Sequence, residues 1–127
     1  MKSNKDKRDQ SEFNMAVSYL NRLNTLFYVC DEASSSLDAS VWYHTLCTIY
    51  RELSTEMNPE EIKNFDSEMM KINTEINKYI NNQYKGLSKL DSNTYFMLHK
   101  FELKLRHILK DSGLQQKIVD SAEMALR

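Results

Sequence analysis

The sequence predicts an all-α fold: an up-and-down bundle of four main helices followed by a short C-terminal helix. Three observations support this prediction: a long amphipathic stretch from Asn58 to Gly86, further stretches with the same periodicity, and a scarcity of turn residues. Only two Gly and one Pro occur in 127 residues, too few for the many turns of a β-rich chain. A chain of this length is typical of one domain, which we expect to span residues 12–127.

The stretch from Asn58 to Gly86 has a recognisable start and end. Asn58 suits the N-cap, Pro59 the first helical position, and Glu61 the carboxylate of a capping box. Gly86 suits the left-handed residue that ends a helix. The apolar seam covers barely three heptads, which favours packing inside one chain over a coiled coil between chains. Its residues are Ile62, Phe65, Met69, Ile72, Ile76 and Tyr79.

Two apolar stretches precede this helix. From about Glu12 to Ala33 the apolar residues cover roughly half of a helical wheel, which predicts a helix at the centre of the core with neighbours on two sides. The serines at 34–36 indicate a short connection, and Ser36 or Asp38 can cap the next helix, antiparallel to the first. The stripes comprise Phe13, Ala16, Val17, Leu20, Leu23, Phe27 and Cys30 in the first helix, and Trp42, Leu46, Ile49, Tyr50, Leu53 and Met57 in the second.

Two more helices are expected after residue 90. The fourth begins near Asp91 or Ser92, both suitable N-caps, and runs to about Asp111, before Gly113. A short helix from about Leu114 to Leu126 completes the chain. The stripe of the fourth helix comprises Thr94, Met97, Leu98, Phe101, Leu105, Ile108 and Leu109.

Residues 1–11 are rich in charge and lack apolar periodicity, so we expect a flexible N-terminal tail. The alternative is a short basic arm that touches a polyanion through Lys2, Lys5, Lys7 and Arg8, although Asp6 and Asp9 interrupt it.

The sequence contains no recognisable metal, cofactor or catalytic motif. His44, His99 and His107 each lack a glutamate three positions earlier, which argues against a ferritin-like centre. Cys30 and Cys47 have no metal spacing, and they fall at different heights of the predicted helical hairpin, which argues against a disulfide. We therefore expect a protein that is not an enzyme and has no cofactor.

Composition narrows the class of protein further. No apolar run reaches the ~20 residues of a membrane span, and the charged N-terminus is unlike a signal peptide. We therefore expect a cytoplasmic protein that does not bind membranes. The net charge of −1 gives no general attraction to nucleic acid. The abundance of Asn, Lys and Ile would fit a phage or low-GC bacterial origin.

One feature of the fourth helix exceeds what a bundle requires. Phe96 and Leu103, seven positions apart, project away from the main apolar stripe. Three interpretations are open: the C-terminal helix folds back over them through Ile118 and Ala122, they dock an acidic amphipathic partner or a second copy, or Phe96 stacks on a base while the cations bind phosphates. The surrounding polar residues are His99, Lys100, Arg106, His107 and Lys110.

The functional hypothesis is a non-enzymatic interaction module, acting as an adaptor, a small regulator or an assembly subunit. It would bind a protein partner, or itself as a homo-oligomer, through this basic and apolar face of the fourth helix. The alternative hypothesis is a small helical subunit that associates with nucleic acid through the Lys and Arg residues of the tail and of the fourth helix.

Overall fold

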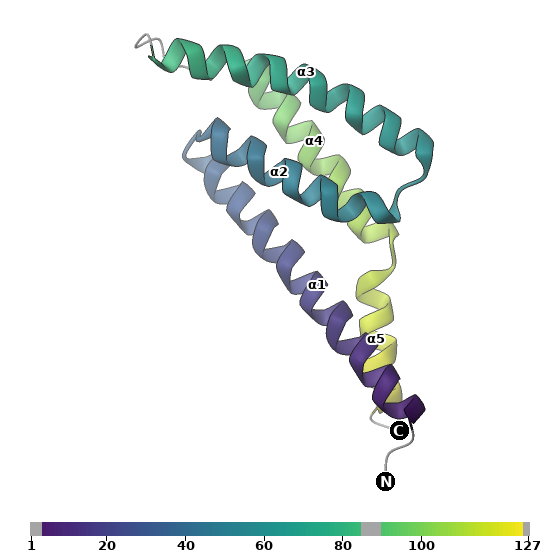
Figure 1. The fold of residues 1–127 in the computed structure, drawn as a ribbon. Helices are drawn as coiled ribbons and strands as arrows, with labels where there is room; N and C mark the ends of the chain where they lie inside the picture. The colour runs from purple at the N-terminus through teal and green to yellow at the C-terminus, as the bar shows by residue number, and fades with distance from the viewer. Residues whose placement is uncertain (1–3, 85–89, 126–127) are drawn as a thin grey trace.

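The computed structural model describes residues 4–84 and 90–125, and it is all-α over these ranges. Helices α1 to α4 run up and down through the bundle, as predicted, so that each is antiparallel to the one before it (Figure 1). Helix α5 instead continues from α4 with a slight bend. The elements are α1 (Asn4–Ser35), α2 (Ala39–Leu53), a 3-10 turn η1 (Ser54–Glu56), α3 (Pro59–Tyr84), α4 (Ser92–Asp111) and α5 (Leu114–Ala125).

Helix α1 begins at Asn4, well before the start near Glu12 that apolar periodicity predicted. Most of the predicted tail is therefore helical. Lys, Arg and Gln have high intrinsic helix propensity, so a segment that lacks an apolar stripe can still be helical. The prediction relied on periodicity, which reports only the part of a helix that meets a core.

The turn between α1 and α2 reverses the chain within three residues. Leu37 adopts a left-handed conformation with φ of 58°, and the N–H of Asp38 bonds to the carbonyl of Ala33 at 2.8 Å. The Asp38 side chain then accepts a hydrogen bond from the N–H of Val41 at 3.2 Å, which caps α2. Of the two caps considered from the sequence, the structure uses Asp38.

The predicted capping box at the start of α3 is confirmed. The side chain of Asn58 accepts a hydrogen bond from the N–H of Glu61 at 2.8 Å, and the Glu61 carboxylate accepts one from the N–H of Asn58 at 3.1 Å. The predicted stop at Gly86 lies outside the described residues.

The core lies where α2, α3 and α4 meet the second half of α1. Trp42, Leu46 and Ile49 of α2 are almost fully buried, and α2 packs against both α1 and α4. Tyr50 and Phe65 pack edge to face with ring centroids 5.5 Å apart, and Phe65 packs against Phe101 at 5.3 Å. This aromatic cluster joins α2, α3 and α4, so the seam of α3 is satisfied inside the chain.

The first half of α1 and α5 form a two-helix stalk that leaves the bundle (Figure 1). We define the stalk as residues 10–20 and 114–123. None of its residues with described burial is buried, and the core begins only at Leu23. Helix α1 has 32 residues and α2 only 15, so the start of α1 extends past α2 and packs against α5. The expected central position therefore holds for the second half of α1 only.

Candidate functional site

Helix α4 carries the surface that the sequence singled out, and an N-cap fixes where this helix begins. The Asp91 carboxylate accepts a hydrogen bond from the N–H of Thr94 at 2.6 Å. This bond stabilises the charged form and lowers the pKa of Asp91 below its usual value. The first residue of α4 and the position of its buried side chains together determine which side chains of α4 face outward. The buried side comprises Thr94, Leu98, Phe101, Glu102, Leu105 and Leu109.

The opposite side of α4 forms an exposed strip of apolar and basic residues. At 100° per residue, its members fall within a sector of about 80° that points away from the core. The side chain of Phe96 is 65% exposed and that of Leu103 is 45% exposed, both high for large apolar residues. We call this surface the α4 strip and define it as Phe96, Lys100, Leu103, His107 and Lys110.

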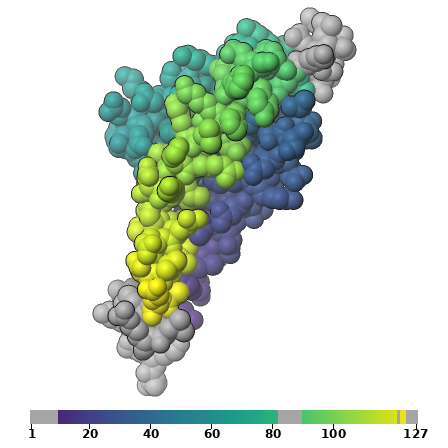
Figure 2. Space-filling view, turned by 180° about the vertical axis from the view of Figure 1, so that it is seen from behind, coloured from purple at the N-terminus to yellow at the C-terminus, as the bar shows by residue number. Residues whose placement is uncertain are grey.

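Helix α5 does not cover the α4 strip. Only Ser112 and Gly113 separate the two helices, and their N–H groups bond back to carbonyls of α4, so the chain continues with only a slight bend. Gly113 is left-handed, with φ of 71°. Helix α5 therefore packs on α1, and α4 runs uncovered along the face seen in Figure 2. The first interpretation of Phe96 and Leu103, burial beneath Ile118 and Ala122, is wrong for this structure.

Arg106, included among the candidate partner-binding residues, is engaged inside the chain. Its Nη2 lies 3.0 Å from Oδ1 of Asp31, and its Nε lies 3.2 Å from Oε2 of Glu102. Its guanidinium also lies 4.5 Å from the ring centroid of Phe27. Arg106 therefore joins α4 to α1. On the other edge of α4, Lys104 pairs with Glu68 of α3.

Glu102 is the buried polar residue that the sequence analysis missed. Its Oε1 accepts a hydrogen bond of 2.9 Å from Nε1 of Trp42, while its second oxygen faces Arg106. A glutamate on the apolar side of a helix, four positions before an arginine, was the signal available in the sequence. The lone Trp also needed an acceptor for its indole N–H once buried. These contacts give Glu102 a structural role.

The two other lysines of α4 differ from Lys104 and Arg106. Within the described parts of the chain, neither Lys100 nor Lys110 forms an ion pair. His99 stacks on Tyr95 with ring centroids 6.2 Å apart. His107 borders a shallow cleft of ≈ 280 Å³ between α4 and α3, whose other lining residues are Glu61, Asn64, Phe65, Lys104, Ile108 and Asp111.

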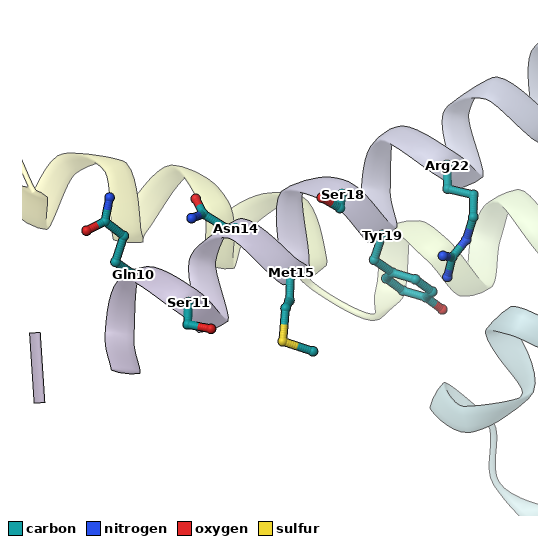
Figure 3. A pocket seen from close by; sticks show the side chains of 7 residues that line it. All are labelled: Gln10, Ser11, Asn14, Met15, Ser18, Tyr19 and Arg22. Atoms are coloured by element: carbon teal, nitrogen blue, oxygen red, sulfur yellow. The ribbon is translucent and has the colours of Figure 1, made fainter. Parts of the chain in front are cut away.

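A larger hollow of ≈ 760 Å³ lies on the stalk, and its described lining residues all belong to α1 (Figure 3). At one end Tyr19 donates a hydrogen bond to the carbonyl of Glu52, and Arg22 pairs with the Glu52 carboxylate at 2.8 Å. Among the described lining residues, Arg22 is the only charged one. The lining residues are Gln10, Ser11, Asn14, Met15, Ser18, Tyr19 and Arg22.

The thiols lie in surroundings that suppress their reactivity. Burial raises the pKa of Cys30 to about 12, and burial also raises the pKa of Cys47. Both cysteines are free. In the described ranges, no group of three or more His, Cys, Asp or Glu side chains is arranged to hold a metal ion. Nor is any described helix both long enough and apolar enough to cross a membrane.

Comparisons with known proteins add no relative to this picture: no family model, no curated protein and no solved structure matches the chain. The proposed function therefore rests on the fold and on the exposed residues of α4.

Proposed function

We propose that this protein is a non-enzymatic interaction module that binds a protein partner through the α4 strip. It would act as an adaptor, a small regulator or an assembly subunit. Its free thiols fit a reducing compartment such as the cytoplasm.

The observation that supports this proposal is the exposure of Phe96 and Leu103 on one side of a well-capped helix. Their Cα atoms lie about 10 Å apart along the helix axis, and Lys100 lies between them. Isolated exposed apolar side chains are common on proteins. Phe96 and Leu103 instead share one side of a helix with two lysines that form no ion pair among the described residues, which favours an interface. Because the helix already fixes their backbone, binding would have to order only their side-chain torsions.

The experiment compares proteins captured from the native cell by the wild type, by Phe96→Asp and by Leu103→Asp. We expect both variants to lose a partner that the wild type retains. The matched control is Met70→Asp, which introduces the same charge at an apolar position of α3 that is 72% exposed. This control should retain the partner.

Circular dichroism and thermal unfolding separate a lost contact from a lost fold. Because both side chains face solvent, we expect the free energy of unfolding to change by only about 0.5 kcal/mol. Unfolding of Phe96→Asp or Leu103→Asp would instead place these residues in the core and refute the proposal. If both variants still capture the same partner as the wild type, the proposal is refuted as well.

The same experiment tests the nucleic-acid alternative. If the captured material disappears on nuclease treatment, and if its binding weakens steeply with salt, the second hypothesis replaces the first. Partners that survive nuclease treatment agree with the protein-binding proposal.

A further inference from the structure

We propose that the α4 strip recognises an acidic amphipathic helix of the partner protein. This inference rests on the proposed function and names the kind of partner that the surface fits. The apolar residues of the partner helix would rest on Phe96 and Leu103, and its carboxylates would pair with Lys100 and Lys110.

The first support is the division of the cations of α4 into two groups. Lys104 and Arg106 are neutralised by carboxylates of α3 and α1, at the two edges of the helix. Lys100 and Lys110 lie on the outward side and have no ion-pair partner among the described residues. The positive charge that remains free for an external partner therefore coincides with the exposed apolar side chains.

The second support is the order of the residues along the helix. Phe96, Lys100, Leu103 and Lys110 occur at steps of four, three and seven residues, so they alternate apolar and cationic over about 21 Å. A helix packed along α4 presents residues at matching steps of three, four and seven. A partner with apolar residues at i and i+7, and with Glu or Asp between and beyond them, would match the two apolar residues and the two lysines of the strip.

The third support is the acidic border on each side. Asp31 of α1 lies beside one edge of α4, and Glu68 of α3 lies beside the other. Glu61 and Asp111 line the cleft next to His107. Because Asp31 and Glu68 are paired with Arg106 and Lys104, the two edges of α4 offer no net positive charge to a broad polyanion such as nucleic acid, and Glu61 and Asp111 would repel it. A narrow acidic stripe on a helix meets only the cations, and the chain's net charge of −1 adds no general attraction.

The roles of the two kinds of contact differ. Burial of Phe96 and Leu103 would supply most of the affinity, because exposed ion pairs contribute little. The lysines would select acidic over basic helices, since a like charge opposite them is repelled.

The experiment selects helical peptides that bind the immobilised full-length protein. The displayed library fixes apolar residues at i and i+7 and randomises the neighbouring positions among Glu, Gln and Lys. We expect the selected helices to be strongly enriched in Glu and depleted in Lys. Each selected peptide is then measured against the double variant Lys100→Glu/Lys110→Glu, for which we expect binding at least about tenfold weaker.

A matched double variant controls for total charge. Lys63→Glu/Lys71→Glu makes the same change at two exposed positions of α3. We expect it to bind the selected peptides as the wild type does. Equal loss of binding in both double variants would show that only net charge matters, which overturns the proposal.

Two further outcomes separate failure of this inference from failure of the proposed function. If binding of the selected peptides depends on Phe96 and Leu103 but the peptides show no preference for Glu, the partner is not an acidic helix. Binding through the α4 strip, which is the proposed function, is then still supported. If the selected peptides bind Phe96→Asp and Leu103→Asp as tightly as the wild type, the surface is refuted too. Analytical ultracentrifugation tests whether a second copy of the chain occupies the α4 strip instead. If the wild type self-associates and Phe96→Asp does not, a second copy is the occupant and the inference is overturned.

Discussion

The indole N–H of Trp42 donates a hydrogen bond of 2.9 Å to Oε1 of Glu102, and both side chains are buried. The two residues come from α2 and α4 and lie 60 positions apart in the sequence. The other oxygen of Glu102 accepts from Arg106, which also pairs with Asp31 of α1. This network connects three helices through polar groups that are costly to leave unpaired.

We expect Glu102→Ala to lower the free energy of unfolding by about 2–4 kcal/mol, because it leaves a buried indole N–H without an acceptor and removes the carboxylate beside Arg106. Glu102→Gln retains an acceptor for Trp42 and should cost only about 1 kcal/mol. Urea unfolding followed by the fluorescence of the single Trp measures both values. Equal stability of the two variants would show that the hydrogen bond to Trp42 contributes nothing.

The stalk should unfold more easily than the bundle. Leu20 of the stalk is half-buried, whereas Leu23, one turn further along α1, is fully buried. We expect Leu23→Ala to cost about 3 kcal/mol and Leu20→Ala about 1 kcal/mol or less. Hydrogen exchange should be faster for residues 10–20 than for residues 23–33, because local opening of the stalk does not expose the core. Uniform protection along α1 would contradict this expectation.

The Asp91 cap makes stability depend on acid pH. Hydrogen bonds from the N–H of Thr94 lower the folded-state pKa of Asp91, so its contribution is present above the unfolded pKa of about 4 and is lost as pH falls through the folded pKa. We expect Asp91→Ala to cost about 1 kcal/mol at neutral pH, and Asp91→Asn to cost less because Asn also caps helices.

Urea midpoints measured at neutral pH and near pH 3 test this prediction. Asp91→Asn has no titrating group at the cap, so the stability difference between the wild type and this variant should shift with pH. A difference that stays constant between the two pH values would exclude a contribution from Asp91.

The buried thiol of Cys30 should not react in the folded protein. Burial raises its pKa to about 12, so at neutral pH the reactive thiolate is absent and the sulfur is covered. In a Cys47→Ser variant, Cys30 is the single remaining thiol, and a thiol reagent should modify it only as fast as the protein unfolds. Modification much faster than unfolding would show that Cys30 is accessible.

The Cys30 thiol should also make the stability of the protein fall at alkaline pH. Below the unfolded pKa of about 9, Cys30 is protonated in both states and stability does not depend on its ionisation. Between about 9 and 12 the unfolded thiol loses its proton while the buried one retains it, so the unfolded state is favoured as pH rises. Cys30→Ala should therefore reduce the alkaline loss of stability, measured by urea unfolding at about pH 8 and pH 10.

The sequence by itself determined the fold class, most helix boundaries and most of the core. The caps at Asp38, Asn58 and Asp91 act on backbone groups within three residues, so local sequence identified Asn58 and limited each of the other two caps to two candidates. Apolar periodicity identified the buried sides of α2, α3 and α4 because each of these helices meets the core along its length. It misplaced the start of α1 and overstated the burial of residues 13–20, which extend beyond the bundle.

Only the tertiary structure decided which polar groups of α4 are free. The sequence groups Arg106 with Lys100 and Lys110 on one basic side of the helix. The structure joins Arg106 to Asp31, 75 positions away, and leaves the two lysines without an ion-pair partner among the described residues. The path of α5, which exposes Phe96, likewise depends on its packing against α1. Contacts between distant segments depend on how helices pack, and the periodicity of a single helix shows which side is buried but not which residues of other helices it meets.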